Sequence, residues 1–314
     1  MIELEYTKCD LCNSNDNVFL FKGRDYRFGH KEEYSIVKCD KCGLIYLNPR
    51  PNIEIMSKLY EQDYTPENKP ETLPKPETKE WRKILKEIWH KINGQYVDEI
   101  ISEAKGSVLD VGCGNGYLLL SLKQEGCKVY GIEANPKSVK TCKELGLEVF
   151  CGTVEDAKFP NGFFDAIVMS QVLEHLPSPR ESLKEVYRIS KPNGKVFIYC
   201  PNAESYLSKF FGKFWHGWHI PFHFYGFSQK TIKKIIEDTG FKIEEINSVT
   251  PDHFFTVSLK CFLHGEKING IRPVDRAAIF DSLIFRMFIS PIFRILDFIL
   301  KGEGDCLKVR IIKK

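Results

Sequence analysis

The sequence predicts an α/β protein with a doubly wound, Rossmann-like sheet, preceded by a small cysteine-rich unit. Strand-like and helix-like segments alternate from residue 107 onward, a glycine-rich turn follows the first strong strand, and two Cys-x-x-Cys pairs precede both. Alternating strands and helices form a parallel sheet that is covered on both faces. At 314 residues, the chain is long enough for one such core with additions.

The cysteine-rich unit is expected to span residues 1–50 and to bind zinc. Its two thiolate pairs are Cys9 with Cys12 and Cys39 with Cys42. Each pair can bend around one ion, and two pairs close a tetrahedral site of four sulfurs. The β-like stretches at residues 18–21 and 34–37 lie between the pairs, which is typical of a zinc ribbon. Because four thiolates leave no position for water, the predicted zinc is structural and not catalytic.

Residues 51–80 are predicted to form a short helix and a proline-rich linker. The helix covers residues 53–60, and the linker carries four prolines among charged residues and threonines. Apolar residues at helical spacing then predict a helix over residues 81–104, with which a larger domain of residues 81–314 begins.

The turn after the strand at residues 107–111 has the features of a nucleoside-binding loop. It carries glycine at three alternate positions: Gly112, Gly114 and Gly116. Such glycines let the backbone approach a small ligand. Glu133 ends the next strand, where a doubly wound sheet holds ribose hydroxyls. Tyr117 stands where a dinucleotide fingerprint requires its third glycine. Because Asp110 adds a carboxylate suited to a cation, the pattern indicates S-adenosylmethionine.

The run from Asp110 to Gly116, followed by Glu133, resembles the cofactor loop of the class I S-adenosylmethionine-dependent methyltransferases. Four further motifs follow in the family's order: residues 152–156, 163–170, 173–177 and 191–198. The resemblance covers about residues 95–250. It implies methyl transfer and a seven-stranded sheet in which residues 306–312 form an antiparallel last strand.

The resemblance also implies which residues contact the cofactor. The glycine-rich turn, including Cys113, would surround the methionine part, and Glu133 would bind the ribose. The adenine would lie against Val154, Glu155 and Asp156, with Asp156 accepting from its amino group. Ser170 and Gln171 would face the sulfonium at the end of the fourth strand.

Two histidines are candidates for a general base. The sulfonium itself activates the methyl group, so the protein mainly aligns the reactants and removes a proton from the acceptor. His223 is the preferred base and His175 the alternative. His223 lies in residues 214–225, a segment rich in histidine and tryptophan that forms either a platform for a sugar ring or a packed loop. No carboxylate in this segment supports a metal site there.

An insertion at about residues 251–305 separates the last two predicted strands. Its core, residues 279–301, reads as an apolar helix with a polar stripe that begins at Ser282 and Arg286, and Pro291 would kink or divide it. The helix is too charged for a bilayer span. It either packs within the protein or lies on a membrane surface through residues 276–301, where it would guide the enzyme to a lipid-linked acceptor.

The combination of a four-cysteine ribbon with this domain resembles methyltransferases of sugar and natural-product pathways, which implies a small-molecule acceptor. An RNA methyltransferase that uses the ribbon, and a non-catalytic cofactor-binding scaffold, are the alternatives. A net charge of only +3 argues against nucleic-acid binding. The acidic N-terminus lacks the features of a signal peptide, so we expect a cytoplasmic protein, peripheral on the inner face of the membrane if the helix binds lipid.

Overall fold

The computed structural model describes residues 3–26, 31–63, 96–264, 280 and 282–314. The proline-rich linker and the first part of the helix predicted over residues 81–104 lie outside the described residues. The rest of that helix is α3, Tyr96–Glu103. The helix predicted over residues 53–60 is confirmed as α1, Ile53–Asp63.

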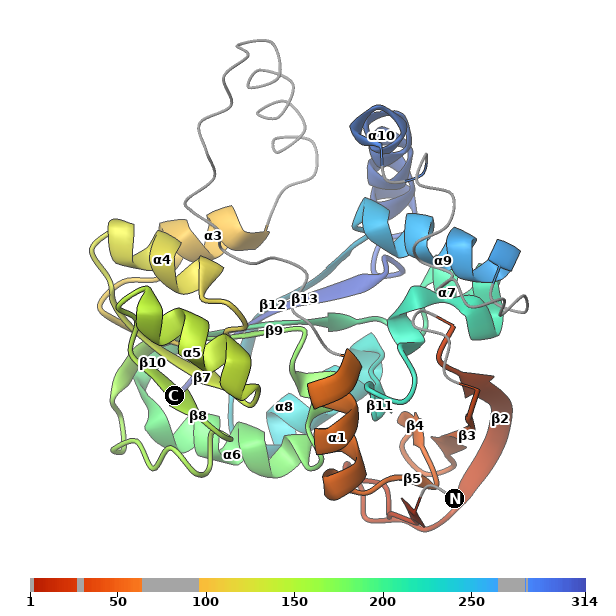
Figure 1. Ribbon diagram of the computed structural model, residues 1–314, viewed down its shortest axis with the longest axis horizontal. Helices are drawn as coiled ribbons and strands as arrows, with labels where there is room; N and C mark the ends of the chain where they lie inside the picture. The colour runs from red at the N-terminus through yellow and green to blue at the C-terminus, as the bar shows by residue number, and fades with distance from the viewer. Residues whose placement is uncertain (1–2, 27–30, 64–95, 265–279, 281) are drawn as a thin grey trace.

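A seven-stranded sheet forms the centre of the molecule, in the order β12-β13-β10-β9-β6-β7-β8 (Figure 1). Its strands are β6 (Ser107–Val111), β7 (Lys128–Glu133), β8 (Val149–Cys151), β9 (Phe164–Ser170), β10 (Ser190–Pro201), β12 (Lys242–Val249) and β13 (Cys306–Ile312). Strands β8, β7, β6, β9 and β10 pair in parallel, whereas β13 runs antiparallel to both of its neighbours. The predicted Rossmann-like sheet with an antiparallel last strand is therefore confirmed. Because all strands except β13 run in the same direction, the loops at their carboxyl ends meet at one edge of the sheet.

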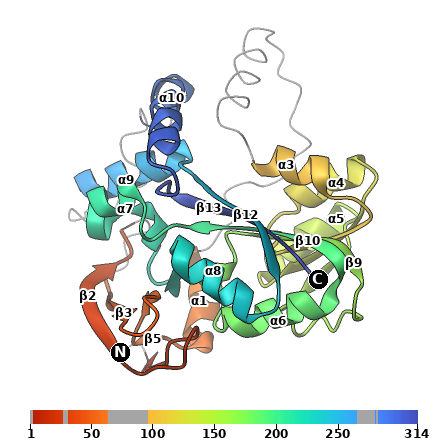
Figure 2. The ribbon, with the colours of Figure 1, turned by 180° about the vertical axis from the view of Figure 1, so that it is seen from behind.

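Helices cover both faces of this sheet, as the two opposite views show (Figures 1 and 2). The principal helices are α4 (Tyr117–Gln124), α5 (Pro136–Glu144), α6 (Pro179–Ile189) and α8 (Gln229–Asp238). Helices α3, α4 and α5 pack on one face with Val108, and α6 and α8 pack on the other with Leu109. Adjacent residues of one strand thus enter opposite cores, as the two-residue period of a strand requires.

The N-terminal unit builds its sheet partly from the second half of the chain. A pair of short strands, β1 (Leu4–Glu5) and β5 (Arg50–Pro51), lies beside a four-stranded sheet of β2 (Asn17–Arg24), β3 (Glu33–Cys39), β4 (Ile45–Leu47) and β11 (Tyr225–Gly226). Strand β11 follows the histidine-rich segment directly and pairs with β4. The unit is therefore attached to the edge of the main sheet where the candidate site lies.

The insertion contains two long helices, α9 (Asp252–His264) and α10 (Leu283–Ile299). The helix expected over residues 279–301 corresponds to α10, which continues through Pro291 without a break. The sequence did not predict α9. The polar stripe of α10 faces inward, since Arg286 donates to both oxygens of buried Asp252 at 2.7 and 2.9 Å. Its apolar side chains include Phe288 and Phe298, which are 75% and 76% exposed. In the described part of the chain, no helix combines the length and apolar character needed to cross a bilayer.

The glycine-rich turn gives a stability prediction. Gly112 has φ +71°, and a Cβ there would lie 2.5 Å from Val172 Cγ2, whereas Gly126 has φ +83° and open space around the same atom. Gly126→Ala should therefore lower the free energy of unfolding by about 1 kcal/mol, the cost of left-handed backbone alone. Gly112→Ala adds overpacking and should cost about 2–4 kcal/mol. Urea unfolding of both variants measures the difference, and equal losses would contradict the tight approach of Val172.

Candidate active site and metal centre

The turn between β6 and α4 adopts a backbone conformation that glycine favours. Gly112, Gly114 and Gly116 have φ values of +71°, +53° and +79°. At Gly114 a Cβ would meet no atom within 4 Å, so the turn opens onto free space at that position. The Cys113 side chain is buried on the other side, because its sulfur would lie 2.8 Å from a Cβ at Gly131. The turn thus offers a ligand its backbone, not the thiol of Cys113.

Glu133 lies at the end of β7, directly beside this turn. Its Oε2 accepts a hydrogen bond from the Gly114 N–H at 2.9 Å, and its Oε1 accepts from the Asn135 N–H at 2.8 Å. These two bonds fix the carboxylate at the mouth of the turn. Each oxygen keeps a lone pair, so the carboxylate can still accept from a pair of hydroxyl groups such as those of a ribose.

Asp110 is the second carboxylate of this region and is buried. Burial, the neighbouring Glu133 carboxylate and Cys142 together raise the pKa of Asp110 to about 8. A buried carboxyl group that is costly to ionise becomes a favourable partner for a cationic ligand, because the cation offsets the cost of the negative charge.

The three residues predicted to contact adenine face in different directions. Val154 is buried, and Asp156 Oδ2 accepts from the Thr153 hydroxyl at 2.8 Å. Glu155 Oε1 accepts from Ser182 of α6 at 2.6 Å, so this carboxylate is directed toward α6. The stretch starts next to Glu133, because the Gly152 N–H donates to the Glu133 carbonyl oxygen.

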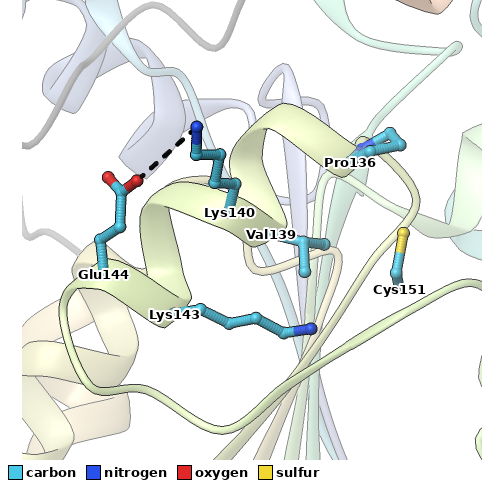
Figure 3. Close-up of a pocket in the computed structure, with 6 residues that line it drawn as sticks. All are labelled: Pro136, Val139, Lys140, Lys143, Glu144 and Cys151. Atoms are coloured by element: carbon cyan, nitrogen blue, oxygen red, sulfur yellow. Dashed lines mark ion pairs between the residues drawn. The ribbon is translucent and has the colours of Figure 1, made fainter.

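A surface depression of about 560 Å³ lies beside this stretch (Figure 3). Its lining consists of Pro136, Val139, Lys140, Lys143 and Glu144 of α5 and Cys151 of β8. It contains none of the predicted site residues. The depression therefore borders the region expected for adenine without being part of it.

Ser170 and Gln171 lie at the carboxyl end of β9, as predicted. Gln171 has a φ of +56°, and its Nε2 donates to Cys306 Sγ of β13 at 3.5 Å. The Gln171 side chain is thus directed along the sheet edge toward β13. The next residue, Val172, is the one that approaches Gly112, which brings the β9 loop against the glycine-rich turn.

The two candidate histidines come together beside that loop. His175 lies in the short helix η1 (Leu173–His175), and His223 lies in the segment before β11. Their ring centroids are 4.4 Å apart, and the ring planes are nearly perpendicular. His175 Nδ1 lies 3.0 Å from the Phe222 carbonyl oxygen and 2.7 Å from the Tyr60 hydroxyl of α1. Burial lowers the pKa of His175 to about 4, so this ring is neutral at pH 7.

Glu174 is a member of this group that the sequence did not single out. Its side chain is fully buried, and neither carboxylate oxygen has a hydrogen-bond partner among the described residues. His223 Nε2 lies 4.0 Å from Glu174 Oε1. One candidate ligand atom from each of Glu174, His175 and His223 lies within 4.8 Å of the others. The carboxylate missing from residues 214–225 is thus supplied by the motif after β9.

The remaining aromatic residues of 214–225 are largely packed. Trp215 is buried, and its indole N–H donates to Asp305 at 2.6 Å. His216 contacts the rings of His253 and Phe254 of α9. For Trp215 the structure therefore favours the packed loop over the exposed platform.

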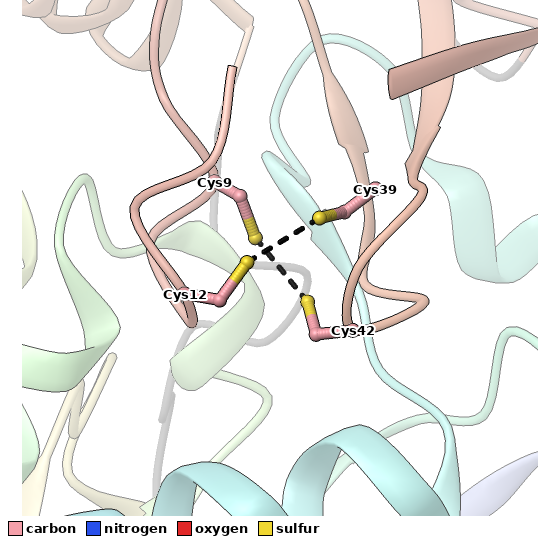
Figure 4. Close-up of side chains that lie close together, drawn as sticks. All are labelled: Cys9, Cys12, Cys39 and Cys42. Atoms are coloured by element: carbon pink, nitrogen blue, oxygen red, sulfur yellow. Dashed lines mark hydrogen bonds between the residues drawn. The ribbon is translucent and has the colours of Figure 1, made fainter. Parts of the chain in front are cut away.

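The four N-terminal cysteines converge on one point (Figure 4). Cys9 Sγ lies 3.4 Å from Cys42 Sγ, and Cys12 Sγ lies 3.4 Å from Cys39 Sγ. A disulfide bond would require about 2.05 Å. Zinc–sulfur bonds of about 2.3 Å in a tetrahedron place sulfurs roughly 3.8 Å apart. The cluster therefore has the donor set and nearly the spacing of a four-thiolate zinc site.

Comparison with known proteins identifies the family. The model of the methyltransferase domain family matches residues 79–246. Ubiquinone biosynthesis O-methyltransferases from Chromobacterium violaceum and Xanthomonas oryzae pv. oryzae are each 37% identical, over 131 and 110 residues. These segments cover 38% and 33% of this chain, and 56% and 46% of the relatives. The chain thus spans about half the length of the relatives it matches.

Solved structures of similar proteins include S-adenosylmethionine-dependent methyltransferases from Archaeoglobus fulgidus and Methanosarcina mazei. Their TM-scores are 0.47 and 0.44, at 23% and 17% sequence identity. The first match covers 73% of this chain and 94% of that chain, and the second covers 67% and 93%. Because the family model matches more than half of the chain, the chain belongs to the methyltransferase domain family.

Proposed function

We propose that this enzyme methylates a small or lipid-linked acceptor, a sugar or natural-product intermediate, with His223 as the general base and His175 beside it. The observation that carries the proposal is the approach of two groups of residues at one sheet edge. Val172 contacts the glycine-rich turn, and Glu174 and His175 follow it in the chain. An acceptor beside the two histidines would therefore face a methyl group held at the turn.

The cofactor contacts in this proposal are those expected from the family. Asp110 and the turn from Gly112 to Gly116 hold the methionine part, and Glu133 binds the ribose. Val154 and Asp156 lie toward the adenine, and Ser170 lies toward the sulfonium. The side chains of Glu155 and Gln171 are directed toward α6 and β13 instead, so they contribute through their backbone only. Bound S-adenosylmethionine supplies an activated methyl group. The protein positions the acceptor, excludes water and receives its proton at His223 Nε2.

The N-terminal unit supports a small-molecule acceptor better than RNA. Strand β11 begins two residues after His223 and pairs with β4 of the N-terminal unit, and Tyr60 contacts His175. We infer that the ribbon forms a wall of the acceptor site and holds its zinc for structural reasons. The ubiquinone biosynthesis O-methyltransferases among the relatives carry small-molecule names, which agrees with this assignment.

The exposed apolar side of α10 supports a lipid-linked acceptor. Its exposed residues follow the three- and four-residue steps of one helix face: Phe288, Ile292, Ile295 and Ile299. Phe298 and Lys301 lie together at its end, with the ammonium 5.8 Å from the ring centroid. An apolar face with a basic end is typical of helices that lie on anionic membranes.

The raised pKa of Asp110 predicts how cofactor binding depends on pH. S-adenosylhomocysteine carries the same ammonium group as the methyl donor, and that cation favours the ionised carboxylate. In the protein without ligand, Asp110 is protonated below about pH 8. The affinity for S-adenosylhomocysteine should therefore rise between pH 6 and 8, at most tenfold per pH unit. Calorimetry should show that Asp110→Asn binds more weakly at pH 8 and loses this dependence. The control variant Asp98→Asn, which changes an exposed carboxylate, should behave as the wild type. If neither the wild type nor the variants bind S-adenosylhomocysteine, methyl transfer by this protein is contradicted.

The cysteine cluster predicts one structural zinc ion per chain. Elemental analysis should find about one equivalent in the wild type and none in Cys39→Ser. Because β4 follows the cluster and pairs with β11, loss of the metal should lower the melting temperature by roughly 10 °C. Cys151→Ser, which changes an exposed cysteine outside the cluster, serves as control. If the wild type contained no zinc and had the same melting temperature as Cys39→Ser, the predicted zinc ribbon would be refuted.

The α10 face predicts binding to anionic liposomes. Inserting two phenylalanines contributes about 3 kcal/mol, so Phe288→Ser with Phe298→Ser should weaken partitioning roughly 100-fold. Ile53→Ser changes an apolar residue of α1 that is 64% exposed and should leave flotation unchanged. If the wild type does not float, or the double variant floats equally well, the lipid-linked acceptor is excluded.

A further inference from the structure

We propose that Glu174 is a positioning residue that shares with His223 the proton taken from the acceptor. The inference rests on the proposed function, in which His223 is the base, and adds a residue that the family motifs did not assign. Glu174 acts through the imidazole and does not need to contact the acceptor itself.

The carboxyl group of Glu174 is isolated in the interior of the protein. The Glu174 side chain is fully buried, and both of its oxygens lack hydrogen-bond partners among the described residues. A buried carboxyl group without partners is costly and is rarely retained without a function. The titratable groups around it are the thiols of Cys200 and Cys306 and the rings of His175 and His223. Of these, a ring nitrogen of His223 lies 4.0 Å from Glu174 Oε1.

The hydrogen bond of His223 determines which ring nitrogen carries the hydrogen in the neutral imidazole. Its Nδ1 lies 2.7 Å from the Gly217 carbonyl oxygen. Because a carbonyl oxygen can only accept, Nδ1 carries the hydrogen, and the neutral ring has its lone pair on Nε2. Nε2 is the nitrogen that faces Glu174. A proton that arrives at this nitrogen therefore lies between the imidazole and the carboxylate.

Hydrogen bonds from the residues on both sides of His223 fix its position relative to Glu174. The Phe224 N–H donates to the Glu174 carbonyl oxygen at 2.8 Å, which ties the residue after His223 to η1. His175 Nδ1 meets the Phe222 carbonyl oxygen on the other side of His223. The base is thus fixed from both flanking residues relative to Glu174.

The chemistry of the step balances in charge. The acceptor atom forms a bond to the methyl carbon, the carbon–sulfur bond breaks, and its electron pair stays on sulfur. The acceptor proton passes to His223 Nε2 and is shared with the Glu174 carboxylate. The sulfonium cation and the carboxylate anion are both neutralised in this step, which a buried site of low dielectric constant favours.

Burial supports a shared proton over a bound cation at this group. It raises the pKa of Glu174 to about 8, so without a cofactor the carboxyl group carries a proton at pH 7. A sulfonium bound nearby would lower this pKa and release the proton. A divalent ion on Glu174, His175 and His223 would leave a net positive charge in the same enclosed space.

The test compares the proton release that accompanies binding of S-adenosylmethionine and S-adenosylhomocysteine at pH 7, measured by calorimetry in buffers of different ionisation heat. Both ligands carry the ammonium group that acts on Asp110, but only the first carries the sulfonium. Wild type should release about half a proton more with the sulfonium ligand. Glu174→Gln, isosteric with the neutral acid, should lose this difference, and the exposed Glu181→Gln should keep it. An unchanged difference in Glu174→Gln would overturn the proposal, whereas failure of both ligands to bind would refute the proposed function instead.

A second measurement on the wild type alone covers the case in which Glu174→Gln does not fold. The nitrogen-15 shift of His223 Nε2 should show an inflection near pH 8 that reports the ionisation of Glu174. A His223 signal without this inflection would overturn the proposal. Selective broadening of the His223 signal by one equivalent of Mn²⁺ would also overturn the proposal, because it would identify Glu174, His175 and His223 as a metal site.

Discussion

Two backbone hydrogen bonds to one carboxylate determine the geometry of the glycine-rich turn, where we propose that the cofactor binds. Glu133 ends β7 and accepts from the N–H groups of Gly114 and Asn135, so the glycine-rich turn and the start of α5 are tied to the same side chain. The three glycines of this turn have positive φ values, a backbone conformation that residues with a Cβ rarely adopt. Asp110 lies beneath this turn and adds a second carboxyl group, whose ionisation is costly because the group is buried beside Glu133.

The surroundings of the two candidate histidines depend on the N-terminal unit. Arg50 donates to the Pro177 carbonyl oxygen at 2.9 Å and to the Tyr225 hydroxyl at 3.2 Å, so the end of the ribbon fixes the loop after η1 and strand β11 together. Tyr60 of α1 reaches His175 from the same side. The N-terminal unit thus shapes the surroundings of both histidines.

The sequence predicted what local patterns specify, and it missed what long-range contacts create. Alternating strands, the glycine turn and the cysteine pairs follow from spacing within short windows, and the fold confirmed the sheet down to its antiparallel last strand. The sequence did not indicate Glu174, because its neighbour His223 lies 49 residues later in the chain. The contribution of β11 to the ribbon and the inward polar stripe of α10 depend likewise on distant partners, β4 and Asp252. Helix α9 lacks a clear polar face, which is why a period of 3.6 did not reveal it.

The most direct test of this account is an experimental structure with S-adenosylhomocysteine bound. The account predicts that the ribose hydroxyls hydrogen-bond to Glu133, that the ammonium group lies against Asp110, and that the sulfur points toward the space between Val172 and His223. A nucleoside bound elsewhere, with Glu133 and Asp110 facing away from it, would contradict the assignment of this sheet edge as the catalytic centre.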